Sequence, residues 1–155
     1  MEKTNVMRVL DQKKVSYTPY YYDGAGTTTG EEIAGMLNQN PDRVFKTLVT
    51  VGAPNKYYVF DVPVNRELNL KKAAKAVGEK KIEMVKSKEL LPLTGYIHGG
   101  CSPIGMKKFF TTTFHQTAQS FEKIIFSAGR IGFQVELSLD DLKKVIRFNV
   151  ADICD

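Results

Sequence analysis

A glycine-rich stretch, Gly95-Tyr-Ile-His-Gly-Gly-Cys-Ser-Pro-Ile-Gly-Met-Lys-Lys108, limits the ways in which this chain can fold. It places four glycines, a serine and a proline within eleven residues, between two apolar runs. Glycine permits positive φ angles and a close approach of the backbone to a ligand. Two interpretations are open: an elaborate turn between buried elements, or a shaped loop whose N–H groups bind an anionic oxygen.

Length and composition favour one domain, spanning 1–155. The 155 residues include 43% hydrophobic and 25% charged side chains, which is ordinary for a globular protein with a sizeable core. The N-terminus has no apolar core of a signal peptide, and no apolar run is long enough to cross a membrane. We therefore expect a cytoplasmic protein with no membrane partner.

Two cysteines and two histidines raise the question of metal or thiol chemistry. The spacing of Cys101 and Cys154 to His98 and His115 matches no metal site, so we expect free thiols and no metal. A pair of Cys101 with a histidine is a candidate nucleophile. No acidic residue of the stretch is placed to orient that histidine, and cysteine is also a small core residue.

Positive charge is concentrated in one segment. The chain carries a net charge of +5, and the segment 66–88, with eight basic and three acidic residues, accounts for all of it. Such an excess is typical of a polyanion-binding surface, and a solvated helix face is the alternative. The residues expected to contact a nucleic acid are Lys71, Lys72, Lys75, Lys80 and Lys81.

The residue pattern predicts an α+β fold with flanking helices and a mixed, largely antiparallel sheet. Thr29-Gly-Glu-Glu32 matches a capping box, Gly52-Ala-Pro-Asn55 a hairpin turn, and Pro19 favours an edge strand. Six or more strands in so short a chain favour curling toward a barrel. Helices are predicted over 4–14, 29–37, 69–78, 87–91 and 138–146, and strands over 17–22, 44–51, 56–62, 81–85, 109–114, 122–126, 132–137 and, as a short strand or tail, 147–153.

Lys46 and two serines are candidate site residues. Lys46 interrupts an apolar strand and shares a face with Val44 and Leu48, so it either reaches solvent from an edge or lies in a pocket with an anion. Ser102 and Ser127 stand beside glycines at strand ends, outside any Gly-x-Ser-x-Gly elbow. They are interpreted as hydrogen-bonding groups for a ligand or as turn residues.

Four groups of residues carry a resemblance to a known family. They are Val44-Phe-Lys-Thr-Leu48; Leu70-Lys-Lys-Ala-Ala-Lys75 with Lys80-Lys-Ile-Glu-Met84; Thr94-Gly-Tyr-Ile-His-Gly-Gly-Cys-Ser-Pro-Ile-Gly-Met-Lys-Lys108; and Ser127-Ala-Gly-Arg130 with Val135-Glu-Leu137. In this order and over nearly the full length, they resemble the YbaK family of aminoacyl-tRNA deacylases, which is related to the editing domain of bacterial prolyl-tRNA synthetases. The resemblance implies a mixed α/β fold with a curved, barrel-like sheet and no metal or cofactor.

The resemblance also implies a function and residue roles. Members of the family release cysteine from Cys-tRNA(Pro) and Cys-tRNA(Cys), and are thought to work alongside prolyl-tRNA synthetase. Lys46 matches the essential lysine, and Gly99 and Gly100 match the loop that receives the aminoacyl ester. The residues expected to bind substrate are Tyr22, Thr29, Thr47, Ser102, Ser127, Gly129 and Gln134.

Three positions depart from the family's pattern. Thr29 replaces a bulky aromatic residue, Gln134 replaces an acidic residue, and Cys101 replaces an aliphatic residue. The first two bear on how the amino group and the adenosine of the substrate are held. Strict selectivity for cysteine is therefore an open question, and a deacylase for another small amino acid is an alternative.

The expected chemistry is cleavage of the ester at the 3′ end of the tRNA. Backbone N–H groups of Gly99 and Gly100 would stabilise the oxyanion, and Lys46 would hold the terminal phosphate or ribose. The family account adds attack by the thiol of the substrate on its own carbonyl, which needs proximity and no protein nucleophile. Attack by water and a non-catalytic module that binds tRNA or a synthetase are the alternatives.

Overall fold

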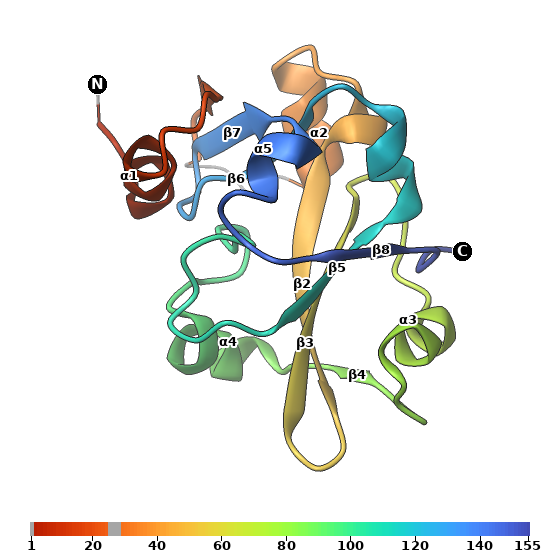
Figure 1. Ribbon diagram of the computed structural model, residues 1–155. Helices are drawn as coiled ribbons and strands as arrows, with labels where there is room; N and C mark the ends of the chain where they lie inside the picture. The colour runs from red at the N-terminus through yellow and green to blue at the C-terminus, as the bar shows by residue number, and fades with distance from the viewer. Residues whose placement is uncertain (1, 25–28) are drawn as a thin grey trace.

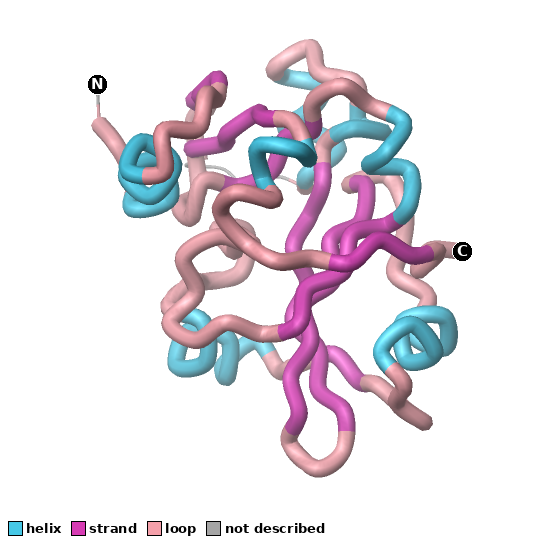
Figure 2. The backbone as a smooth tube through the Cα atoms, in the orientation of Figure 1, coloured by secondary structure: helices cyan, strands magenta, loops and turns pink. Residues whose placement is uncertain are grey.

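The computed structural model describes residues 2–24 and 29–155 (Figures 1 and 2). In this part of the chain, the strands form two sheets, and the helices are interspersed among the strands along the sequence. The elements in order are α1 (Asn5–Gln12), β1 (Thr18–Tyr21), α2 (Gly30–Met36), the 3-10 helix η1 (Pro41–Arg43), β2 (Phe45–Gly52), β3 (Lys56–Pro63), α3 (Leu70–Val77), β4 (Glu83–Met84), α4 (Ser87–Thr94), β5 (Thr111–His115), the 3-10 helix η2 (Gln116–Ser120), β6 (Ile124–Ser127), β7 (Phe133–Leu137), α5 (Leu139–Leu142) and β8 (Asn149–Ala151).

The larger sheet has the strand order β4-β2-β3-β5-β8, and the smaller sheet has the order β1-β7-β6. The β3–β5 and β5–β8 pairs are parallel, and the other pairs are antiparallel. An isolated parallel bridge between Val44 and Ile125 joins the start of β2 to β6. The predicted mixed, largely antiparallel α+β fold is confirmed. The described strands do not close into a barrel, so the barrel-like shape is not confirmed.

The long β2–β3 hairpin has helices on both of its faces (Figure 1). On one face, Tyr58, Phe60 and Val62 pack with Ala73 and Ala74 of α3. We call these residues, with the C-terminal residues beside them, the α3 face. On the other face, α4 and the glycine-rich stretch cover the hairpin. We call this the α4 face, and its core residues are Val49, Val59 and Cys101.

The smaller sheet also has two distinct faces. One face packs through Phe126 and Val135 against Val6 and Leu10 of α1. The other face packs through Ile125 against α2, in a cluster with Val44. Because Val44 begins the strand that leads into the larger sheet, the two sheets meet at this point.

Local sequence signals account for most element ends. The Thr4 side chain accepts a hydrogen bond from the Met7 amide and caps α1. The predicted capping box of Thr29 and Glu32 is present at α2. Asn69 caps α3, which ends at Gly78 in the left-handed conformation.

Some boundaries differ from the prediction. Ser87 is the first residue of α4 rather than its cap, and the helix continues past Pro92 to Thr94, where Gly95 in the left-handed conformation ends it. The helix predicted over 138–146 is regular only over Leu139–Leu142. The two 3-10 helices were not predicted, because short 3-10 turns have no strong sequence periodicity. In the described residues, no helix is long and apolar enough to cross a membrane.

Candidate functional site

Lys46 projects from the α3 face of β2. In the hairpin register it lies opposite Val62, and Leu48, two residues further on the same face, packs in the α3 cluster. The Lys46 side chain is 30% exposed, and its Nζ lies 3.6 Å from Oε1 of Glu67. The lysine therefore has an acidic partner and is partly covered.

A row of polar side chains crosses the smaller sheet near Lys46. Gln134 of β7 lies opposite Tyr20 of β1 and Ser127 of β6, and residues opposite one another project to the same face. Ile125, two residues before Ser127, shares that face and forms the bridge to the start of β2. The side chains of this row and of Lys46 therefore project toward the same side of the region where the two sheets meet.

Gln134 has a partner that the sequence did not suggest. It is 6% exposed, and its Oε1 accepts a hydrogen bond of 2.9 Å from Nε2 of Gln39. The Oε1 atom of Gln39 is itself buried without a hydrogen-bond partner in the described structure. A neutral pair of amides therefore occupies the position where the family resemblance implies an acidic group.

The glycine-rich stretch packs on the turn that follows Ser127. Gly100 is buried, and a Cβ there would lie 3.3 Å from the backbone nitrogen of Ile131. Gly129 has a φ of +94°, and a Cβ there would lie 3.0 Å from the Tyr96 ring. A side chain at either position would crowd its neighbours, and the positive φ of Gly129 also favours glycine there. The structure therefore brings Gly99 and Gly100 beside Gly129 and the turn after Ser127. Lys46 projects from the α3 face of the hairpin, whereas the glycine-rich stretch covers the α4 face.

Hydrogen bonds within these loops narrow the predicted set of donors. The Gly100 N–H donates to the Ile97 carbonyl at 3.0 Å, so this amide is already used in a turn. The expectation that both glycines donate to the substrate is therefore revised in favour of Gly99, which is exposed and has a φ of +87°. The Ser127 hydroxyl accepts from the Gly129 N–H at 3.1 Å, and it retains a proton to donate.

Ser102 and Cys101 are buried beneath the stretch. Ser102 is fully buried, and its Oγ accepts a hydrogen bond of 3.3 Å from the Ile104 amide, so it serves as a turn residue in this structure. Burial, with a smaller contribution from the charge of Asp61, raises the pKa of the Cys101 thiol to about 12. A thiol with that pKa is protonated at neutral pH and is a poor nucleophile.

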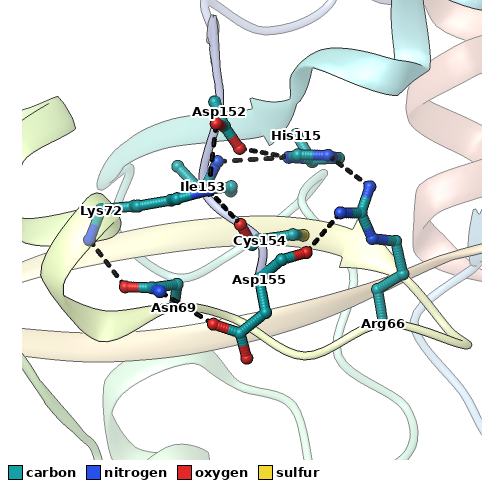
Figure 3. A network of polar contacts seen from close by, with 8 residues as sticks. All are labelled: Arg66, Asn69, Lys72, His115, Asp152, Ile153, Cys154 and Asp155. Atoms are coloured by element: carbon teal, nitrogen blue, oxygen red, sulfur yellow. Dashed lines mark hydrogen bonds and ion pairs between the residues drawn. The ribbon is translucent and has the colours of Figure 1, made fainter.

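In the described structure, neither histidine forms a hydrogen bond with the Cys101 thiol. His98 is exposed, and His115 is buried in a polar network with Arg66 and the C-terminal residues (Figure 3). No group of three or more His, Cys, Asp or Glu side chains in the described chain could hold a metal ion. The Cys/His hydrolase alternative therefore gains no support from the geometry.

Thr47 faces away from Lys46, because neighbouring strand residues point to opposite faces. Its hydroxyl donates a hydrogen bond of 2.6 Å to Oδ1 of Asp61. Asp61 is fully buried on the α4 face, and its Oδ2 has no hydrogen-bond partner in the described structure. Burial raises the Asp61 pKa to about 8, and the hydrogen bond from Thr47 opposes that shift. The position of Thr47 therefore does not support the predicted contact with substrate.

Tyr22 and Thr29 flank residues 25–28, which lie outside the described part of the chain together with part of the predicted turn over 23–26. Tyr22 is half-buried, and its amide donates to the Gly132 carbonyl at 3.0 Å, beside the turn after Ser127. Thr29 is exposed and uses its hydroxyl to cap α2. Tyr22 therefore lies beside the predicted site, whereas the structure shows a helix-capping role for Thr29.

Comparison with known proteins shows the family of this chain. Residues 25–145 match the family model described as an aminoacyl-tRNA editing domain. The chain is 45% identical, over 98% of its length and 93% of the other protein, to a protein of Enterococcus faecalis named "Putative Cys-tRNA(Pro)/Cys-tRNA(Cys) deacylase EbsC". The chain belongs to the aminoacyl-tRNA editing domain family. The match includes Lys46, the glycine-rich stretch and the turn after Ser127.

Solved structures confirm the editing-domain fold. A crystal structure titled as a putative trans-editing enzyme for prolyl tRNA synthetase superposes with a TM-score of 0.85 at 21% identity, covering 99% of each chain. The hypothetical protein APE2540 superposes with a TM-score of 0.87 at 21% identity, covering 98% of this chain and all of the other. At these identities the likeness concerns the fold alone.

The lysines predicted to contact tRNA lie on and after α3 of this editing domain. Lys71, Lys75 and Lys80 are exposed, and Lys81 is exposed and pairs with Glu83 at 3.2 Å. Lys72 differs, because its Nζ lies 3.1 Å from Oδ2 of Asp152 and donates to the Cys154 carbonyl at 2.7 Å. Lys72 is therefore engaged within the protein, and the other four lysines remain candidates.

Sequence reasoning missed Gln39 and Glu67 as neighbours of the site. Gln39 lies 95 residues before its partner Gln134, and Glu67 lies 21 residues after Lys46. Neither residue stands in a recognisable motif. The only available signal was the acidic Glu67 within a basic segment, and it does not indicate which lysine the carboxylate contacts.

Proposed function

We propose that this protein is an aminoacyl-tRNA deacylase that releases cysteine from Cys-tRNA(Pro) and Cys-tRNA(Cys). The observation that carries the proposal is the 45% identity over 98% of the chain to the relative named for that activity. The shared editing domain includes the residues around Lys46 and the glycine-rich stretch. The acceptor end of a charged tRNA is the partner, prolyl-tRNA synthetase is a further partner, and the cytoplasm is the compartment.

The protein contributes positioning and charge to the reaction. Lys46 binds the terminal phosphate or ribose, and the Gly99 amide donates to the carbonyl oxygen as it becomes an oxyanion. Ser127 and Gln134 lie on the face of the smaller sheet that carries Ile125, where the two sheets meet. There they contact the aminoacyl group. The buried amide pair of Gln134 and Gln39 presents neutral polar atoms, so the ammonium group of the substrate binds there without a carboxylate partner.

The ester is cleaved by the thiol of the substrate. The cysteine sulfur attacks its own carbonyl carbon, and the bond from that carbon to the ribose oxygen breaks. The thiol proton passes to the ribose oxygen, which gives a cyclic thiolactone and free tRNA. The reaction depends on proximity and uses no thiol of the protein. It is therefore compatible with a Cys101 thiol that stays protonated because its pKa is raised.

A panel of charged tRNAs tests the substrate. Purified protein should release cysteine from Cys-tRNA(Pro) and Cys-tRNA(Cys), and should release serine from Ser-tRNA much more slowly, because a hydroxyl is the weaker nucleophile. Equal rates for cysteine and serine would favour attack by water. Binding of tRNA without any release would leave a non-catalytic module as the function.

Substitution of Lys46 tests the site. Lys46→Ala should lower the release of cysteine by at least about a hundred-fold. The matched control is Lys143→Ala, at an exposed lysine just after α5, which should keep the wild-type rate. A Lys46→Ala variant with full activity would remove this lysine from the site.

The exposed lysines of α3 and its following loop are proposed to contact phosphates of the acceptor stem. Such contacts release counterions, so the apparent affinity should fall steeply as salt rises. Lys71→Gln with Lys75→Gln should reduce the slope of log affinity against log salt by about two. An unchanged slope would place the tRNA elsewhere on the surface.

A further inference from the structure

The C-terminal segment, defined here as 152–155, lies against the loop 65–69 that follows β3. Arg66 links the two (Figure 3): its Nη2 donates to the Asp155 carbonyl at 2.5 Å, and its Nη1 lies 2.9 Å from Nε2 of His115. His115 is 1% exposed. The guanidinium group is therefore held by a backbone oxygen on one side and a buried ring on the other.

The other end of the loop is held in the same way. Leu68 and Cys154 form an isolated antiparallel bridge, and the Asn69 amide donates to the Ile153 carbonyl at 2.8 Å. The Asn69 side chain adds a hydrogen bond of 2.8 Å to Oδ1 of Asp155. Asn69 also caps α3, so the C-terminal segment, the loop and the start of that helix form one connected unit.

Glu67 stands between these two anchored positions. Its side chain is 82% exposed, and its carboxylate is the partner of Lys46 at 3.6 Å. An ion pair this exposed contributes little to folding stability. The pair matters instead for orientation, because a lysine has several rotatable bonds and an unpaired ammonium group samples many positions.

We propose that the C-terminal segment positions Lys46 in the deacylase site, by fixing the loop that presents Glu67. Glu67 is a positioning residue, and the C-terminal segment acts through it. This inference rests on the proposed function, because it assigns Lys46 to the site. It follows from the order of contacts: the segment holds Arg66 and Leu68, these residues place Glu67, and Glu67 faces the ammonium group.

Kinetics with Cys-tRNA(Pro) test the proposal. Glu67→Gln should lower kcat by about ten-fold with an unchanged melting temperature, because misplacement of a catalytic group affects the chemical step. Arg66→Gln should lower kcat similarly, and any loss of phosphate contact would appear in KM. The double variant should fall no further than the lower single variant, because both changes act through one unit.

A control and a second measurement complete the experiment. Asp140→Asn removes the acid of a similar exposed pair, in which Asp140 lies 3.7 Å from Lys143, and it should keep the wild-type kcat. Acetylation of lysines, mapped by mass spectrometry without any tRNA, reports on Lys46 directly. Glu67→Gln and Arg66→Gln should both increase the labelling rate of Lys46 and leave that of Lys143 unchanged.

The two measurements separate the possible failures. Wild-type protein without deacylase activity, but with coupled labelling of Lys46, would overturn the proposed function and keep the structural link. Active wild-type protein whose two variants retain kcat and the labelling rate would overturn the positioning role. Independent, multiplying losses in kcat would also overturn it, because they would show that Arg66 does not act through Glu67.

Discussion

The two faces of the β2–β3 hairpin bury titratable groups in opposite ways. On the α4 face, Asp61 is fully buried and receives one hydrogen bond, from Thr47. On the α3 face, His115 is buried between the Arg66 guanidinium group and the Ile153 amide, which donates to Nδ1 at 3.2 Å (Figure 3). The acid therefore has one donor, whereas the histidine faces a donor at each of its two ring nitrogens.

This difference predicts opposite responses to pH. The Asp61 pKa is raised to about 8 by burial, so the folded protein binds a proton that the unfolded chain releases above about pH 4. Stability is therefore lost at this residue as pH rises from 4 to 8. Burial and the nearby charge of Arg66 lower the His115 pKa below 6.5, so stability is lost there as pH falls below 6.5.

The number of partners does not by itself decide how well a buried group is accommodated. Both ring nitrogens of His115 face N–H donors, and a neutral imidazole can accept at only one of them. Asp61 is accommodated when it is protonated, because a neutral carboxyl group loses less on leaving water. Both buried groups are therefore favoured in their neutral forms. Asp61 becomes charged at high pH, and His115 becomes charged at low pH.

Asp61→Asn should produce the largest effect. The amide keeps an acceptor for Thr47 and cannot ionise, so the variant should exceed the wild type in stability at pH 9 by on the order of 5 kcal/mol. At pH 4 the two proteins should differ by less than about 1 kcal/mol. Urea unfolding at both pH values measures the difference, and a gap that does not widen with pH would show that Asp61 stays charged.

Phe114→Ala should be the next largest. Phe114 is fully buried, its ring contacts those of Phe45 and Phe148, and it lies opposite Asp61 between β3 and β5. Loss of this side chain should lower the free energy of unfolding by about 3–5 kcal/mol. The loss should be the same at every pH, because neither phenylalanine nor alanine has a titratable side chain. A cost that depended on pH would mean that the ring also screens Asp61 from water.

Thr47→Val should cost less, about 1–3 kcal/mol, because it leaves both carboxyl oxygens of Asp61 without a donor. The hydrogen bond from Thr47 lowers the Asp61 pKa, so its removal should raise that pKa further. The pKa can be followed by NMR titration of the Asp61 carboxyl carbon. In an Asp61→Ala background, which lacks the acceptor, the cost of Thr47→Val should shrink, and an equal cost in both backgrounds would contradict the pairing.

His115→Gln should give the smallest change and the opposite dependence on pH. At pH 7.5 the variant should lose about 1–2 kcal/mol through weaker contacts with Arg66 and Ile153. As pH falls below 6.5, protonation of His115 destabilises the folded wild type, whereas glutamine does not titrate. The difference in stability between the two proteins should therefore narrow. Thermal unfolding from pH 7.5 to 5 measures it, and a widening gap would indicate that the buried ring is charged.

How much the sequence predicts depends on how far apart the interacting residues are. The capping box at Thr29 was predicted because its two side-chain contacts join residues only three positions apart. The clustering of the glycine-rich stretch with the turn after Ser127 followed from the family resemblance. It has a physical basis in Gly100 and Gly129, where a side chain would crowd Ile131 and Tyr96 respectively.

The contacts that the sequence did not reveal join residues far apart in the chain. Gln39 with Gln134 and Arg66 with Asp155 are separated by 95 and 89 residues, and no local propensity encodes such pairs. The bond from Gly100 to Ile97 is local, but a glycine N–H that turns inward looks the same in sequence as one that faces a ligand. These are the points at which the predicted site had to be revised.

The position of the C-terminal segment beside loop 65–69 has a consequence for synthesis of the protein. Arg66 is added to the growing chain 89 residues before Asp155, whose carbonyl oxygen accepts its hydrogen bond. At 5–20 residues per second, that interval is roughly 5–20 seconds. During this time the strands β2 and β3 can pair, but the loop that presents Glu67 lacks its anchors. The nascent protein can therefore form its hairpin before residues 152–155 are available to hold the loop.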